Sequence, residues 1–381
     1  MRIALLTYST RPRGGVVHTL HLAEALASLG HDVHVWTLGR GGDAGFFRPV
    51  DASVTVHAVP FADVDGEDVG ARIVRSIQVL GEALTPAIPT YDVVHAQDCI
   101  SANAALEAPG LVRTVHHLDT FTTRELVACH DRAVRRPSRL LCVSVAVAEE
   151  VRLAYDRTPP VIPNGVAADR FRAAADDDVA RAAWRERLGR YVLAVGGIEP
   201  RKGSLDLLES FALLRDGRPD LASIRLVFAG GETLFDYRGY RAEFEARAAA
   251  LGVEPVVLGA VDDDALPSLV AEAAALPFLS VKEGFGLAAL EALAAGTPVV
   301  ARDLPVLREV LGGTVAFGST PPQFASALAA AVDRPPHPGP GRALAASYTW
   351  DRAARSHLDF YAGAVDGVAE QGGCARSSGS R

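Results

Sequence analysis

The order of apolar runs and glycine turns is the feature that most constrains the fold of this chain. A short apolar strand over 3–7 leads to the pair Gly14-Gly15, apolar residues then recur at helical spacing up to Gly30, and a second strand follows at 33–36. Three more apolar runs extend the series, over 91–95, 112–116 and 140–144. Strands that alternate with helices form a parallel sheet covered by helices. The sequence therefore predicts an α/β fold.

A second series of strands begins near residue 191. Its apolar runs cover 191–195, 224–229, 256–258, 275–279 and 298–301. Between the two series, Ala173 to Asp178 mixes small and acidic residues, which is typical of a surface linker. A last helix begins at Trp350 and runs to about Tyr361, and a Gly-, Ser- and Arg-rich tail follows, which we expect to be disordered over 366–381. Ligands of open α/β sheets bind beyond the carboxyl ends of the strands, so two such domains predict an interdomain cleft.

Composition narrows the class of protein. The chain has 381 residues, 49% of them hydrophobic and 22% charged, which is enough for two domains with large cores. A net charge of −8 argues against nucleic-acid binding, which needs a basic surface. The four cysteines lack C-x-x-C spacing, so we expect neither a zinc site nor a disulfide framework. Without an export signal or an apolar run of about 18 residues, we expect a cytoplasmic protein.

The stretch Ser280 to Glu291 places a carboxylate on each side of a glycine turn that leads into a helix. Gly284 and Gly286 let backbone N–H groups approach a ligand closely, and the helix from Leu287 presents its positive end to an anion. If the run were wholly helical, Glu283 and Glu291 would be about 12 Å apart. Carboxylate pairs that hydrolyse glycosidic bonds are roughly 5 to 9.5 Å apart. This spacing suits an elongated ligand held at both ends.

The same stretch resembles the E-x7-E signature of retaining glycosyltransferases of the GT-B fold, sequence family 4. The likeness continues to Val300 and includes four further motifs in family order, Gly14-Gly15, Thr114-Val115-His116, Pro163-Asn164-Gly165-Val166 and Arg201-Lys202-Gly203. It implies two facing Rossmann-like domains, with the last helix crossing back to the first. The domains would then be 1–166 with about 348–365, on the acceptor side, and 167–347, on the donor side.

The resemblance also implies the catalytic residues. In the family, Glu283 would contact hydroxyls of the donor sugar, and Arg201 with Lys202 would balance the charge of the departing diphosphate. His116 would contact the donor sugar; His117 and Asp119 are neighbouring alternatives, and the T-x-H spacing favours His116. Many relatives have Gly-Arg where this chain has Gly196-Gly197, so the family's additional arginine has no evident match here.

Further residues are assigned to donor binding by the same resemblance. Glu291 would bind the ribose, the Leu258-Gly259 turn would lie at the nucleobase, and Gly14-Gly15 would close over the diphosphate or position the acceptor. The complete donor-binding set is Gly14, Gly15, Gly230, Leu258, Gly284, Phe285, Gly286, Leu287 and Glu291.

The sequence thus predicts a retaining, metal-independent glycosyltransferase that uses a nucleoside-diphosphate sugar and no cofactor. Asp63-Val64-Asp65 matches a metal-binding D-x-D, but it lies far from the other motifs, and Asp262 to Asp264 are expected to cap the next helix. The acceptor would be a small molecule, a lipid or a glycan. A basic patch, Arg124, Arg132, Arg135, Arg136 and Arg139, would allow peripheral contact with the inner face of a membrane. The alternatives are a nucleotide-sugar epimerase of the same fold and a non-catalytic nucleotide-sugar-binding protein.

Overall fold

The structure is a computed structural model that describes residues 1–121, 123–231 and 237–374, with side chains described as far as 363. The chain divides into two compact units. Unit 1 comprises Met1–Gly165 with Trp350–Arg381, and unit 2 comprises Val166–Thr349. The sequence predicted domain boundaries after residues 166 and 347, and the two units are divided after residues 165 and 349.

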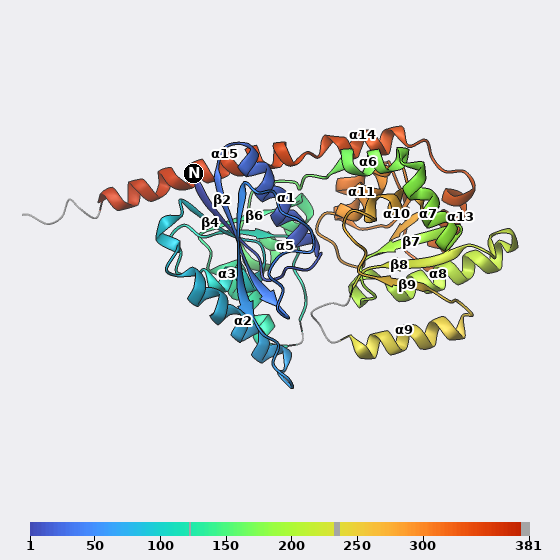
Figure 1. Ribbon diagram of the computed structural model, residues 1–381, viewed down its shortest axis with the longest axis horizontal. Coiled ribbons are helices and arrows are strands. Elements are labelled where there is room, and N and C mark those ends of the chain that lie inside the picture. Colours follow the sequence, from blue (N-terminus) through green and yellow to red (C-terminus); the bar gives the residue numbers. More distant parts are fainter. Residues whose placement is uncertain (122, 232–236, 375–381) are drawn as a thin grey trace, which may run out of the picture. The chain divides into compact units, whose positions relative to one another are not determined.

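Unit 1 is a parallel six-stranded sheet with helices on both faces (Figure 1). The strand order is β3-β2-β1-β4-β5-β6, which is the doubly wound order of a Rossmann fold. Its strands are β1 (Arg2–Leu6), β2 (Asp32–Arg40), β3 (Val54–Phe61), β4 (Val93–Ala96), β5 (Val112–Val115) and β6 (Arg139–Cys142). Its helices are α1 (Gly14–Ser28), α2 (Val69–Leu84), η1 (Ile88–Thr90), α3 (Cys99–Ala104), α4 (Arg124–Arg135), α5 (Val145–Tyr155) and α15 (Trp350–Cys374).

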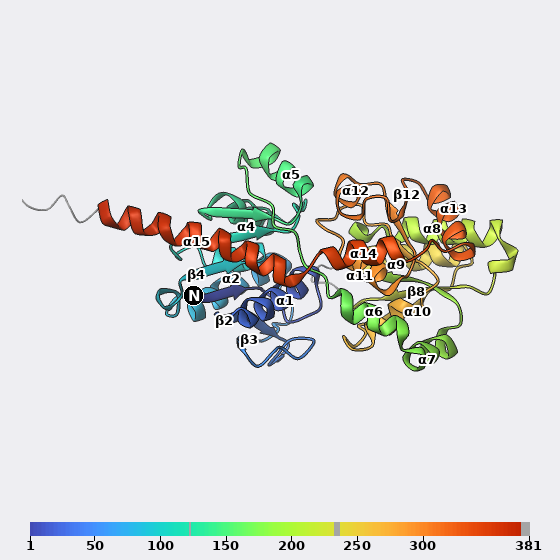
Figure 2. The same ribbon diagram turned by 90° about the horizontal axis from the view of Figure 1, so that it is seen from above.

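The alternation of side chains along β1 explains how both faces of this sheet are covered. Ile3 and Leu5 are buried with residues of α1 and α15. Ala4 and Leu6 are buried with residues of α2 and α3 on the other face. Figures 1 and 2 show α15 lying along the same face as α1, so the last helix belongs to unit 1 as expected.

Unit 2 repeats this design. Two three-stranded parallel sheets, β9-β8-β7 and β10-β11-β12, are joined by a parallel bridge between Val192 and Ala275, which gives the same winding order as unit 1. The strands are β7 (Tyr191–Val195), β8 (Arg225–Ala229), β9 (Val256–Gly259), β10 (Leu276–Phe278), β11 (Val299–Arg302) and β12 (Ala316–Gly318). The helices are α6 (Ala168–Asp176), α7 (Asp178–Leu188), η2 (Pro200–Lys202), α8 (Ser204–Gly217), η3 (Pro219–Leu221), α9 (Arg238–Ala250), α10 (Leu266–Glu272), α11 (Leu287–Ala295), α12 (Pro305–Leu311), α13 (Pro321–Asp333) and α14 (Gly339–Ser347).

Two expectations about local structure were wrong. The supposed linker over 173–178 lies in α6 and α7, because its alanines favour helix and Asp177 accepts a hydrogen bond from the Ala180 N–H at the start of α7. The last helix does not end near Tyr361 but continues to Cys374 through an alanine-containing, proline-free segment. The remainder of the expected tail, 375–381, lies outside the described residues.

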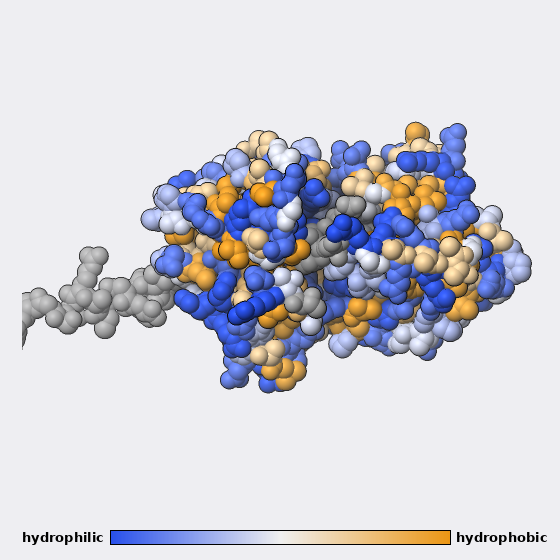
Figure 3. Space-filling model, turned by 90° about the horizontal axis from the view of Figure 1, so that it is seen from below, coloured by the Kyte–Doolittle hydropathy of each residue, from blue (hydrophilic) through white to orange (hydrophobic). Residues whose placement is uncertain are grey.

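Across the described residues, no helix combines the length and the apolar character needed to cross a bilayer. On the face shown in Figure 3, hydrophobic residues are interspersed with hydrophilic ones.

Candidate active site

Two loops of unit 2 bring Glu283 together with the predicted cation pair. Arg201 and Lys202 lie in η2 after β7, and Glu283 lies between β10 and α11. The Lys202 Nζ is 3.2 Å from Glu283 Oε2, and the Arg201 Nη1 is 3.6 Å from the same oxygen. The side chains of Arg201, Lys202 and Glu283 are between 14% and 28% exposed, so a ligand can reach the charged group of each. The sequence prediction that they form one site is consistent with this geometry.

Backbone contacts fix the two loops to each other. The Val281 N–H donates to the Arg201 carbonyl at 2.8 Å, and the Arg201 guanidinium donates to the Lys282 carbonyl at 3.3 Å. Gly203 ends η2 with φ of +65°, and a Cβ there would lie 2.3 Å from the Leu279 carbonyl oxygen. Only glycine allows this close approach, so the cation loop is held against the Glu283 loop.

The turn after Glu283 ends at an open helix N-terminus. Gly286 precedes α11 with φ of +101°, a conformation that favours glycine, and no side chain of the described residues caps this end. The first N–H groups of α11, beginning with Leu287, therefore add positive potential beside the two cations. Phe285 instead points into the protein, where it is 4% exposed and packs edge-on to Tyr348. Its predicted part in donor binding would come through the backbone.

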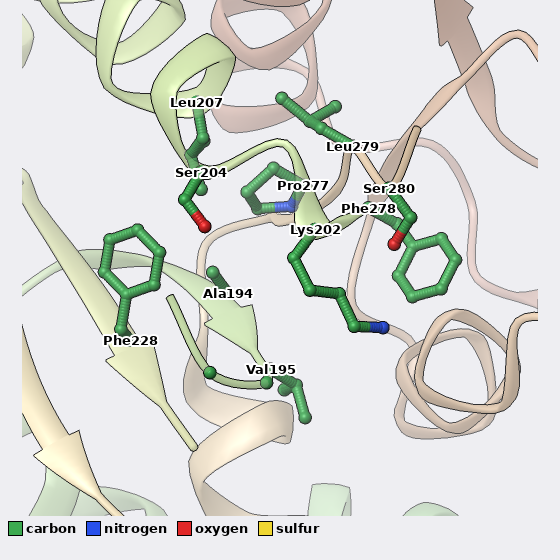
Figure 4. Close-up of a pocket in the computed structure, with 12 residues that line it drawn as sticks. Ala194, Val195, Lys202, Ser204, Leu207, Phe228, Pro277, Phe278, Leu279 and Ser280 are labelled. Atoms are coloured by element: carbon green, nitrogen blue, oxygen red, sulfur yellow. The ribbon is translucent and has the colours of Figure 1, made fainter. Parts of the chain in front are cut away.

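A small cavity lies beside Lys202 (Figure 4). Its lining includes Gly196-Gly197, Lys202, Ser204, Phe278 and Ser280. The Lys202 ammonium lies 5.4 Å from the centre of the Phe278 ring, which holds the lysine stem in place while its charge stays near Glu283. The cavity thus opens at the carboxyl ends of β7 and β10, where ligands of wound sheets bind.

Glu291 occupies a different environment from Glu283. It lies on α11, which packs against α6, and burial raises the pKa of its carboxyl to about 7. Arg170 on α6 lowers this pKa and Asp263 raises it. Arg170 is itself paired with Asp263 at 2.7 Å, which leaves Glu291 as a second carboxylate near one cation. Hydroxyl donors of a ligand would stabilise its ionised form.

The other predicted donor residues of unit 2 lie at strand ends. Gly230 follows β8, and a Cβ there would lie 2.1 Å from the Gly196 carbonyl carbon, so its backbone packs directly on the Gly196-Gly197 turn. Leu258 is in β9 and half-buried, next to Gly259 with φ of +73°. Both positions adjoin the carboxyl edge of this sheet.

In unit 1 the structure brings Gly15 to His116. Gly14-Gly15 begins α1, and a Cβ at Gly15 would lie 3.8 Å from His116 Cδ2. His116 directly follows β5, with its Nε2 3.2 Å from Gln97 Oε1 after the neighbouring β4. The alternative His117 is paired with Asp119 at 2.8 Å.

His116 is half-buried and packs against His18, a fully buried histidine. His18 lies edge-on to it at 4.8 Å between ring centroids and donates through Nδ1 to the Asn164 side chain at 2.9 Å. Burial lowers the pKa of His116 well below its ordinary value, and the neighbouring His18 adds to this effect. His116 is therefore neutral at physiological pH, which suits a hydrogen bond to a sugar hydroxyl.

Several contacts were not anticipated from the sequence. Arg170, Gln97 and His18 belonged to no motif; the position of Gln97 after a strand was the only available signal. The expectation that Asp262 to Asp264 cap α10 was wrong: the helix begins after Ala265 without a side-chain cap among the described residues, and Asp263 pairs with Arg170. In the basic patch, the guanidinium groups of Arg132, Arg135 and Arg139 contact Asn103, Asp131 and the Phe360 carbonyl.

Comparison with known proteins places this geometry in a family. Residues 179–335 match the family "Glycosyl transferases group 1", and residues 12–170 match "Glycosyltransferase Family 4". A D-inositol 3-phosphate glycosyltransferase of Streptomyces scabiei is 30% identical over 96% of this chain and 91% of its own length. An MMP alpha-(1->4)-mannosyltransferase of Mycolicibacterium hassiacum is 30% identical over 82% and 83% of the two chains.

Solved structures share the fold at lower identity. Sucrose-phosphate synthase from Thermosynechococcus elongatus has a TM-score of 0.77 at 18% identity, covering 94% of this chain and 98% of its own. Anabaena HepE in complex with UDP and glucose has a TM-score of 0.72 at 19% identity, covering 95% and 99%. Together with the sequence matches, these show that the chain belongs to the group 1 glycosyltransferases of the GT-B fold and transfers a sugar from a nucleoside-diphosphate sugar to an acceptor.

Proposed function

We propose that this glycosyltransferase retains the anomeric configuration of the donor sugar and needs no metal ion. The observation that carries the proposal is the cluster of Arg201, Lys202 and Glu283, joined to the open N-terminus of α11. Two cations and a helix dipole supply positive charge where a departing nucleoside diphosphate needs it.

The ion pairs within this cluster suggest how donor binding changes it. Without ligand, the Glu283 carboxylate neutralises part of the charge on Lys202 and Arg201. A diphosphate would take over both cations, because it is the more highly charged anion and accepts several charge-assisted hydrogen bonds. Glu283 would then be free to accept hydrogen bonds from the sugar hydroxyls.

The remaining steps follow from the positions of the other residues. The leaving phosphate oxygen would accept the proton of the acceptor hydroxyl as the new bond forms on the same face of the sugar, so no protein nucleophile is required. Glu291 would accept hydrogen bonds from the ribose, and neutral His116 would contact a sugar hydroxyl. The enzyme contributes positioning and electrostatic stabilisation.

The test is a donor screen of the full chain in EDTA, using UDP-, GDP- and ADP-sugars and a panel of small acceptors. NMR of the anomeric proton should show a glycoside with the configuration of the donor. An inverted product would refute retention, and activity that disappears in EDTA and returns with magnesium would refute metal independence. An epimerised free nucleotide sugar without transfer would instead identify an epimerase.

A further inference from the structure

Arg40 is a buried cation that is held by neutral groups. It ends β2 and is 8% exposed, and no ion pair to it occurs among the described residues. Its Nη2 donates to the Ser76 hydroxyl at 2.9 Å and its Nε donates to the Tyr8 carbonyl at 3.4 Å. The guanidinium also lies 5.5 Å from the centre of the Tyr8 ring and 4.8 Å from that of Phe61. Burying a charge among neutral groups is unfavourable unless a counter-ion joins them.

The charges that act on Arg40 include two of the same sign. Arg72 and Arg13 both act on it as like charges, and Asp98 is the carboxylate whose charge opposes them. Asp98 already accepts hydrogen bonds from the Tyr8 N–H at 2.9 Å and the Ser101 N–H at 2.8 Å. The Asp98 carboxylate, which acts on Arg40, is therefore already hydrogen-bonded to backbone N–H groups. The positive charge around Arg40 favours the binding of an anion.

The position of this cluster connects it to the candidate active site. Arg40 ends β2, and Tyr8 follows β1, so both lie at the carboxyl edge of the sheet of unit 1. Arg13 lies 5.8 Å from the Tyr8 ring centre and directly precedes Gly14. The loop that contains Tyr8 and Arg13 is thus the loop that leads into Gly14-Gly15, whose second glycine contacts His116. A ligand of the glycine turn could reach the arginines without leaving this edge of the sheet.

A neighbouring arginine shows what a purely structural role looks like. Arg75 stacks on the same Phe61 ring, at 3.9 Å, but its guanidinium makes two hydrogen bonds with Glu67, at 2.6 and 2.7 Å. The positive charge of Arg75 is therefore balanced by the Glu67 carboxylate of the same chain. Arg40 has the same aromatic neighbour, and within the described part of the chain no carboxylate forms an ion pair with it.

We propose that Arg40, with Arg13, forms a binding subsite for the phosphate group of a small phosphorylated acceptor. The acceptor role rests on the glycosyl transfer proposed above, whereas the binding of phosphate can be measured without it. The phosphate is held in unit 1 and the hydroxyl that attacks the donor sugar belongs to the same acceptor molecule. Arginine suits this task because its planar fork donates to two phosphate oxygens at once.

The first test uses inorganic phosphate as the probe and thermal unfolding of the full chain as the readout. All proteins carry Lys202→Ala, which weakens phosphate binding at the diphosphate site of unit 2. Phosphate should raise the unfolding midpoint of this parent and of the added Arg75→Met variant, the matched control. When Arg40→Met is combined with Lys202→Ala, phosphate should no longer raise the unfolding midpoint. When Arg13→Gln is combined with Lys202→Ala, the rise in the midpoint should be smaller, and the core should be unaltered. Equal increments in parent and Arg40→Met, or none in the parent, would overturn the subsite.

The second test compares acceptors that differ only in the phosphate, such as glucose with glucose 6-phosphate and glycerol with glycerol 3-phosphate. In the wild type, kcat/KM should favour the phosphorylated member, and Arg40→Met should reduce this preference by about ten-fold or more, with Arg75→Met unchanged. If sugar is transferred to neutral acceptors and kcat/KM is the same for their phosphorylated counterparts, the subsite is refuted but the glycosyl transfer is not. Phosphate stabilisation without transfer from any donor would refute the glycosyl transfer alone.

Discussion

Replacing Glu291 by glutamine should make the protein more stable at alkaline pH and remove part of its pH dependence. Burial beside Asp263 raises the pKa of this carboxyl to about 7, against an ordinary value of 4.5, although Arg170 partly offsets the shift. The folded state therefore favours the protonated form. Glutamine has nearly the same shape as protonated glutamate and cannot ionise, so the variant isolates the effect of the charge.

The magnitude follows from the two pKa values. A carboxyl whose pKa rises from 4.5 to about 7 on folding contributes stability that is fully present below pH 4.5 and is lost as the pH rises through 7. The loss amounts to roughly 3 kcal/mol once both states are ionised. We expect Glu291→Gln to match the wild type at pH 4.5 and to exceed its free energy of unfolding by up to about 3 kcal/mol at pH 8.5.

Urea denaturation across this pH range measures the difference, because the two proteins share every other titrating group. A second readout is proton release. If ribose hydroxyls donate to the Glu291 carboxylate, nucleoside diphosphate binding near pH 7 should release a proton from the wild type, and calorimetry in buffers of different ionisation enthalpy should detect it. A constant stability difference at all pH values, or equal proton release from wild type and Glu291→Gln, would refute this reasoning.

Three further predictions concern the other groups. Glu283→Gln should reduce turnover by about ten-fold or more while nucleoside diphosphate affinity stays the same or rises, because the carboxylate no longer competes for the cations; unchanged turnover in a steady-state assay would contradict the role. Lys202→Ala should weaken binding of a nucleoside diphosphate in calorimetry far more than binding of the nucleoside, and equal losses would contradict the diphosphate site. Burial lowers the pKa of His357 to about 4. The neutral imidazole therefore stabilises the folded state above the pKa that this histidine has in the unfolded chain, and this stability is lost as the pH falls toward 4. His357→Phe should move the midpoint of acid unfolding, followed by circular dichroism, to lower pH, and an unchanged midpoint would count against this explanation.

The site around Glu283 could be predicted from sequence because its parts come from strand ends. Arg201 and Lys202 follow β7, Glu283 follows β10, and these strands are neighbours in the sheet. The order of strands and glycine turns, combined with a family motif, is sufficient to predict that such loops lie together. Gly15 and His116 meet for the same reason, at the ends of parallel strands of unit 1.

The surroundings of Glu291 could not be predicted in this way. Arg170, Asp263 and Glu291 come from two helices and a loop that are distant in the sequence, and no local pattern relates them. Two strands were also missed, β3 and β12, and both lie at sheet edges. β3 is only partly buried and contains Pro60, which is unusual within a strand, and β12 has three residues, so neither matches the pattern of a buried central strand.

The most direct test of the proposed site is a crystal structure of the chain, grown in EDTA, with a donor analogue that carries fluorine on the sugar to slow transfer. The account predicts diphosphate oxygens on Arg201 and Lys202, sugar hydroxyls on Glu283, and the ribose on Glu291. A diphosphate bound away from Arg201 and Lys202, or a nucleotide that binds only when a divalent ion bridges its phosphates, would contradict the account.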